Sequence, residues 1–342
     1  MTPGARARSG LALAAAALVL LLTADPAAAD PPRPTDYRST ITDVAPALPS
    51  GVELRIIGGD SLLELSVAEG HTAAVADYPT SDDAEPVPYL RFEADGTVRR
   101  NALAVATTAN DRRFGSSTTV PDPDAAPRWE VVAGDGTYAW HDHRIHWMSP
   151  KAPRNVGPDG VVDLGGADGT WSVPITVDDR PTVVTGELVL EPRPSAAGWL
   201  PAIAVVFGVT ALVGRRFGAR AAAVIALLAG AGATVAALAT ARAVPPEAGG
   251  STVPVVVALV AVAAALVALF GPVRARPAGQ AAAAAALLGW AATRWTVLTR
   301  AVLPTTLAPG LDRLATAVAL GVGAAVVLLL VRPPDTPGAT DA

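Results

Sequence analysis

The sequence predicts an antiparallel β-sandwich, immunoglobulin-like in class, followed by an all-α transmembrane bundle of five helices. Short runs of strand-forming residues alternate with turn residues over residues 30–190. From Gly198 onward long runs of Ala, Val and Leu replace this pattern. The 342 residues are 51% hydrophobic with a mean hydropathy of +0.38, which is too apolar for an ordinary soluble protein. We therefore expect the second half to lie in a lipid bilayer.

Residues 1–29 have the three parts of a secretory signal peptide. Arg6 and Arg8 precede an apolar run over residues 11–22, and small residues follow at positions 27–29. The apolar run is shorter than the ~20 residues that a spanning helix needs. We therefore expect cleavage before Asp30, which leaves the β-domain on the extracytoplasmic side of the plasma membrane.

Two hairpins define the β-domain. Residues 52–57 and 62–67 flank a Gly-Gly-Asp turn, and residues 171–177 and 182–190 bracket a turn over residues 178–181. Shorter strands are predicted at 88–93, 129–132 and 136–140, with a loop-like stretch over 107–127. The chain has no cysteine, so this domain must be held by its core, and thiolate catalysis and cysteine metal sites are excluded.

A proline-rich linker over residues 191–197 separates this domain from five predicted spans, at 198–214, 221–241, 253–271, 278–297 and 314–331. The short loops at 215–220 and 274–276 are rich in arginine, so the positive-inside rule places them and the tail, 332–342, in the cytoplasm. The helices anchor the protein, and small residues on them suit a packed bundle or a membrane or extracytoplasmic protein partner. A net charge of -5 gives no basic footprint for nucleic acid.

Polar residues are few in the second half. Between Trp199 and Val331 the only acids are Glu247 and Asp312, which are predicted to lie in outer loops, so no intramembrane carboxylate is available for ion coupling and transport is disfavoured. Trp290, Arg294 and Trp295 gather near one end of the fourth span. We interpret them as interfacial anchors.

Three of the four histidines fall within six residues, in the segment Tyr-Ala-Trp-His-Asp-His-Arg-Ile-His-Trp-Met at 138–148. If the strand continues through His143, the side chains of His141 and His143 share one face and can chelate one ion. His146 and Met148 join only if the chain turns after Arg144, and His71 joins only if its strand packs alongside. Imidazoles with a thioether suit copper first and zinc second. The candidate metal ligands are therefore His141, His143, His146, His71 and Met148.

Two other interpretations stay open for this segment. In the first, Asp142 pairs with Arg144 and the histidines hydrogen-bond to backbone or carboxylate groups around Trp140 and Trp147, in a structural network without metal. In the second, exposed indole rings beside these polar groups recognise a ligand or a partner. An enzyme is the least supported class, because the sequence contains no nucleophile elbow, no His-Glu-x-x-His, no phosphate loop and no dinucleotide fingerprint.

The order of parts and the segment 138–148 resemble those of uncharacterised exported membrane proteins of actinobacteria. The resemblance covers the first hairpin through Val189 and implies no activity. A weaker architectural resemblance is to exported copper-binding β-sandwiches of the CopC type. Those proteins begin their mature chain with a ligand histidine, whereas this chain would begin Asp30-Pro31-Pro32.

Overall fold

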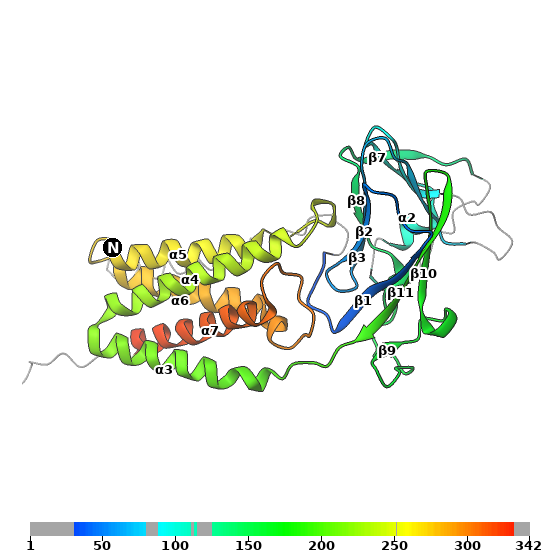
Figure 1. The fold of residues 1–342 in the computed structure, drawn as a ribbon. Coiled ribbons are helices and arrows are strands. Elements are labelled where there is room, and N and C mark those ends of the chain that lie inside the picture. The colour runs from blue at the N-terminus through cyan, green and yellow to red at the C-terminus, as the bar shows by residue number, and fades with distance from the viewer. Residues whose placement is uncertain (1–30, 80–87, 111–112, 115–124, 251, 332–342) are drawn as a thin grey trace, which may run out of the picture.

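The computed structural model describes residues 31–79, 88–110, 113–114, 125–250 and 252–331. The predicted signal peptide and the predicted cytoplasmic tail lie outside these residues, as does most of the loop-like stretch after residue 110. A β-rich region is followed by a helical region, and the β-rich region sits at one end of the helices (Figure 1).

The β-rich region contains two antiparallel sheets. The larger has eight strands in the order β1-β11-β10-β4-β5-β6-β7, with β9 paired to β11, and the smaller has the order β2-β3-β8. All strand pairs in both sheets are antiparallel, as predicted. The strands are β1 (Tyr37–Ala45), β2 (Val52–Ile57), β3 (Leu62–Val67), β4 (Ala73–Ala76), β5 (Pro88–Phe92), β6 (Val98–Asn101), β7 (Trp129–Ala133), β8 (Thr137–Trp140), β9 (Val161–Val162), β10 (Trp171–Val177) and β11 (Arg180–Leu190).

The two predicted hairpins form. Strands β2 and β3 begin and end at the predicted residues, and Gly58 and Gly59 in their turn have φ of 68° and 83°, which glycine adopts without strain. The turn between β10 and β11 is tighter than predicted. Asp178 and Asp179 both have positive φ there, as a two-residue hairpin turn requires, so β11 begins at Arg180.

The sequence did not predict β1, β4, β6 or the short helix α2 (Val105–Ala109). Most side chains of β1 are at least partly exposed, β4 contains three alanines among its four residues, and β6 carries two adjacent arginines. Each therefore lacks the apolar, β-branched pattern by which strands are recognised. Pairing with neighbouring strands, rather than local propensity, makes them part of the sheet.

One apolar core lies between the two sheets. Leu63 and Leu65 of the smaller sheet belong to the same buried cluster as Leu90 and Val173 of the larger sheet. This shared core holds the region together without disulfides, as expected from its size. The immunoglobulin-like topology stays a prediction.

The helical region contains five long helices, namely α3 (Leu200–Phe217), α4 (Ala219–Arg242), α5 (Val253–Phe270), α6 (Arg276–Thr293) and α7 (Pro309–Val331). Four of them, α3, α4, α5 and α7, are long and apolar enough to cross a membrane. Helix α6 packs among them through buried alanines but does not reach that level of apolarity. The structure therefore supports membrane association with four candidate spans, and a fifth span is not confirmed.

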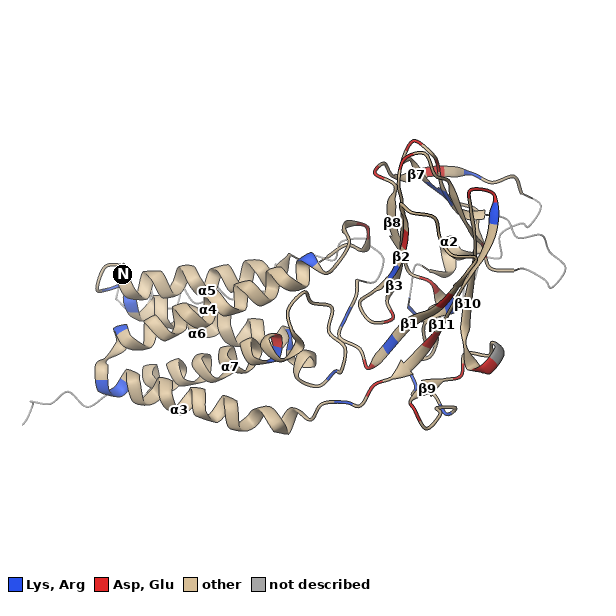
Figure 2. Cartoon of the chain, in the orientation of Figure 1, with Lys and Arg blue, Asp and Glu red and all other residues tan. Residues whose placement is uncertain are grey.

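Charged residues lie at the ends of these helices, and the helix shafts are almost free of them (Figure 2). Arg215 and Arg216 lie in the last turn of α3 and Arg220 in the first turn of α4, whereas Arg274 and Arg276 lie where the chain passes from α5 to α6. Both connections are at the end of the bundle that points away from the β-rich region (Figure 1). The opposite end of the bundle carries arginines together with the two acids, Glu247 and Asp312.

Two predictions about that opposite end are wrong. Asp312 lies in the first turn of α7, not in a loop, and its side chain is 1% exposed. It accepts a 2.6 Å hydrogen bond from Arg294, which is therefore a buried ion-pair partner and not an interfacial anchor. Trp290 is completely buried beneath the Arg294 guanidinium, whereas Trp295 is 54% exposed and remains suited to an interface.

The β-rich region is fastened to the bundle through Asp36, which is buried. Its carboxylate accepts hydrogen bonds from Arg193 of the linker and from Arg300 and the Ala301 amide of the α6–α7 connection. An antiparallel bridge between Thr35 and Val302 lies directly beside these contacts. The start of the β-rich region, the linker and the helical region therefore meet at one carboxylate.

Candidate metal site

The histidine segment leaves the smaller sheet and turns sharply. Strand β8 ends at Trp140, and a 3₁₀ turn, η1, covers His143–Ile145. The Asp142 carboxylate caps this turn by accepting the Arg144 amide. The strand therefore does not continue through His143, so the condition under which His141 and His143 would share a strand face is not met. The turn instead brings His146 back toward His141.

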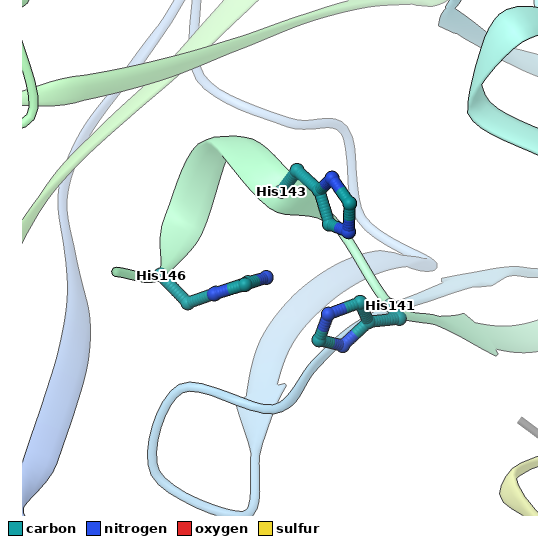
Figure 3. A group of neighbouring side chains, drawn as sticks. All are labelled: His141, His143 and His146. Carbon is teal, nitrogen blue, oxygen red and sulfur yellow. The ribbon is translucent and has the colours of Figure 1, made fainter. Parts of the chain in front are cut away.

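The three imidazoles of this segment face one another (Figure 3). The ring centroids of His141 and His146 are 4.4 Å apart, and that of His143 lies 5.3 Å and 5.2 Å from them. One ring nitrogen from each histidine lies within 4.8 Å of the other two. Two nitrogens bound to one tetrahedral zinc ion at ~2.1 Å are about 3.4 Å apart. Small side-chain rotations would therefore bring all three nitrogens onto one ion.

His141 is buried, and its orientation is fixed by the turn that precedes β3. Its Nδ1 lies 2.6 Å from the carbonyl oxygen of Ser61, which can only accept, so Nδ1 carries the proton. The lone pair of the neutral ring is then on Nε2. That atom is buried and has no hydrogen-bond partner in the described part of the chain.

His146 repeats this arrangement from the other side of the turn. It is fully buried, and its Nδ1 lies 3.1 Å from the Trp147 carbonyl oxygen, so its lone pair is again on Nε2. This second Nε2 is also buried without a partner among the described residues. A carbonyl that holds Nδ1–H while Nε2 stays available is the usual outer-shell arrangement of metal-binding histidines.

Burial keeps both rings neutral. The pKa of His141 is lowered to about 4 and that of His146 to about 2, mainly by desolvation, and the nearby Arg113 guanidinium contributes to both shifts. Neutral imidazole is the form that binds metals. At neutral pH, protons therefore do not compete with a metal for these two nitrogens.

The residues between the histidines form a closed polar network. The buried Asp142 carboxylate receives two hydrogen bonds from the Arg144 guanidinium, of 2.8 Å and 2.7 Å, and one of 2.9 Å from the Trp140 indole. The Tyr78 hydroxyl accepts the His143 amide at 2.7 Å, and the Tyr78 ring lies under the Arg144 guanidinium. These charged and hydrogen-bonded contacts hold the pKa of Asp142 far below its ordinary value despite its burial. The predicted pairing of Asp142 with Arg144 is thus confirmed, and it fixes the turn that carries the imidazoles.

A second buried carboxylate lies next to the site. Asp60 is completely buried and accepts a 2.5 Å hydrogen bond from Arg113, whose positive charge would otherwise oppose a bound cation. Burial raises the pKa of Asp60 to about 6, because desolvation outweighs the attraction of Arg113. This ion pair makes the surroundings of the imidazoles close to electrically neutral.

The other predicted site residues lie elsewhere. His71 is not in the histidine group, and its Nδ1 lies 2.7 Å from the Asp178 carboxylate in the turn of the β10–β11 hairpin. Met148 is 37% exposed. Trp140 is buried and presents no open stacking face, whereas Trp147 is partly exposed and its indole N–H donates to the Lys151 carbonyl.

Sequence reasoning missed the residues that orient the site, which are Ser61, Tyr78, Asp60 and Arg113. They come from three other segments of the chain, and none of them belongs to a recognisable motif. Only their tertiary contacts with the turn reveal them.

Comparison of the chain with protein-family models, with curated proteins and with solved structures finds no match to any of them.

Proposed function

We propose that this chain is a membrane-anchored extracytoplasmic protein that binds one transition-metal ion, copper or zinc, through His141, His143 and His146. The observation that carries the proposal is the pair of buried Nε2 atoms of His141 and His146, which have no hydrogen-bond partner among the described residues and belong to rings that point toward each other and toward His143 (Figure 3). A buried polar atom left without a partner costs about 1–3 kcal/mol. A bound metal ion would remove that cost at both Nε2 atoms.

The ligand set supports a borderline metal. Three neutral nitrogen donors suit Zn²⁺ and Cu²⁺, whereas Mg²⁺ and Ca²⁺ prefer oxygen. His143 is only partly buried, so an ion could enter from its side of the site. The extracytoplasmic location of the site rests on the predicted signal peptide and on the five arginines at the far end of the bundle.

Equilibrium dialysis of the full-length protein in detergent tests the proposal, with bound zinc and copper measured by elemental analysis. We expect one ion per chain for the wild type and loss of that ion in the double variant His141→Ala, His143→Ala. His71→Ala is the matched control, because it removes a histidine outside the group and should leave the stoichiometry unchanged. Uptake that is absent in the wild type, or unchanged in the double variant, contradicts the proposal.

A second candidate is a structural or ligand-recognition module without metal, favoured by the Asp142 network. In that case the segment stiffens one edge of the β-rich region. Replacement of His143 would then lower the melting temperature equally with and without metal. The network, however, uses Trp140, Asp142 and Arg144 and leaves the Nε2 atoms of His141 and His146 without partners, which is why we place metal binding first.

A further inference from the structure

Two connections of the helical region contact the β-rich region beside the residues that support His141. The α6–α7 connection, drawn in orange in Figure 1, contributes Val302, and the α4–α5 connection contributes Ala248 of the short 3₁₀ turn η4 (Pro246–Ala248). Both side chains are buried. They are the points through which the helical region can act on the metal site.

Val302 holds the turn between β2 and β3 against the α6–α7 connection. Its backbone forms an antiparallel bridge with Thr35 through hydrogen bonds of 3.0 Å and 2.8 Å. Its side chain packs so closely on Gly59 that a Cβ added to this glycine would lie 2.8 Å from Val302 Cγ1. No other residue fits at position 59 unless Val302 moves. A displacement of this turn therefore displaces the α6–α7 connection.

The same turn orients the first imidazole of the histidine group. The Ser61 hydroxyl closes the turn with a 3.0 Å hydrogen bond to the Gly58 carbonyl, and the Ser61 carbonyl accepts from His141 Nδ1 at 2.6 Å. Only Asp60, which is completely buried, separates this serine from the glycine that contacts Val302. The contact with the helical region and the contact with the imidazole thus belong to one short, hydrogen-bonded turn.

Ala248 contacts the other side of the same support. It packs in one small buried cluster with Leu62, the residue after Ser61, and with Ala139, two residues before His141. The carbonyl that fixes the imidazole and the strand that carries it are therefore both in contact with the helical region.

We propose that metal binding at the histidine group is coupled to the seating of the β-rich region on the helical region, so that the helical region senses whether the metal is bound. The inference rests on the proposed function. The three ligand nitrogens lie within 4.8 Å of one another, whereas zinc requires about 3.4 Å. Closure of the site therefore rotates His141, and its Nδ1 pulls on the Ser61 carbonyl. The seated arrangement fixes this hydrogen bond and favours metal binding, and by linkage the metal favours the seated arrangement equally.

The zinc affinity of the full-length protein in detergent, measured by competition with a chromophoric chelator, tests one direction of the coupling. Val302→Ala removes the contact with Gly59, and Arg300→Gln removes one guanidinium from the Asp36 carboxylate. Each should weaken zinc binding at least fivefold, the lower end of usual coupling strengths. Val98→Ala is the matched control, because it truncates a buried valine of β6, which pairs with β5 and β7. It should bind zinc as tightly as the wild type.

Hydrogen exchange followed by mass spectrometry tests the opposite direction. The amides of Thr35 and Val302 form the bridge between the two regions, so their exchange reports how often the β-rich region separates from the α6–α7 connection. In the wild type, this exchange should be at least fivefold slower in zinc than in chelator. The double variant His141→Ala, His143→Ala should lose the difference.

The outcomes separate the coupling from the metal site itself. A wild type that takes up no zinc refutes the metal site and the coupling together. If the wild type binds one zinc ion, the coupling alone is overturned by any of three results. These are undiminished affinity in Val302→Ala and Arg300→Gln, an equal loss of affinity in Val98→Ala, or exchange at the bridge that zinc leaves unchanged.

Discussion

Replacement of His146 by leucine separates a metal site from a structural network. In the metal-free wild type, the buried Nε2 has no partner among the described residues and destabilises the fold by about 1–3 kcal/mol, and the change removes this cost. The change also loses the Nδ1 hydrogen bond to the Trp147 carbonyl, which stabilises the fold by about 0.5–1.5 kcal/mol. Leucine also fills most of the same apolar space. The metal-free variant should therefore lie between about 0.5 kcal/mol less stable and about 2.5 kcal/mol more stable than the wild type.

With zinc present, the comparison should reverse. At a free zinc concentration 100 times the dissociation constant, the wild type gains about 2.7 kcal/mol. Loss of one of three ligands should weaken binding at least 100-fold, which reduces that gain to about 0.4 kcal/mol. Removal of the imidazole is thus harmless without the metal and destabilising with it.

The assay is thermal unfolding of the full-length protein in detergent, followed by tryptophan fluorescence in chelator and in buffered zinc. His71→Leu is the control, and it should keep the full zinc-dependent rise in melting temperature because His71 pairs with Asp178 and lies outside the histidine group. An equal zinc-dependent rise in His146→Leu, or strong destabilisation of that variant in chelator, would refute the reasoning.

Three further outcomes are expected. Asp142→Asn should lower the free energy of unfolding by about 3–5 kcal/mol, measured by denaturant unfolding, because it leaves the buried Arg144 guanidinium without its counter-charge; a loss below 1 kcal/mol would contradict this. Gly186→Ala should cost about 1–3 kcal/mol in the same assay, because its Cβ would lie 2.1 Å from the Trp171 ring; unchanged stability would argue against that close packing. The pKa of His141 is lowered from 6.5 to about 4, so the unfolded chain takes up the proton first as the pH falls, and this histidine destabilises the metal-free fold by about 2 kcal/mol between pH 6.5 and pH 4.5. His141→Leu should remove that part of the acid sensitivity, and identical pH profiles for the two proteins would show that the ring is not buried in its neutral form.

The division of the chain into a β-rich half and an apolar helical half followed from the sequence alone. Period-two alternation around Gly58-Gly59 and the long Ala and Val runs are local signals, because strand and helix patterns are set by residues next to one another in the chain. The ionic pairing of Asp142 with Arg144 was also predictable, since the two residues are only two positions apart. Strand β4 and the buried pair of Asp312 with Arg294 were not predictable, because nothing in their own neighbours specifies their partners.

The histidine cluster itself was plain in the sequence, but its use was decided only by tertiary structure. Spacing suggested that His141 and His143 lie on one strand face, whereas the turn capped by Asp142 places His146 beside His141. Which nitrogen carries a proton depends on a carbonyl 80 residues away in the chain, and the exclusion of His71 depends on Asp178. Sequence determines which donors exist, and only the packed chain determines which of their lone pairs remain available.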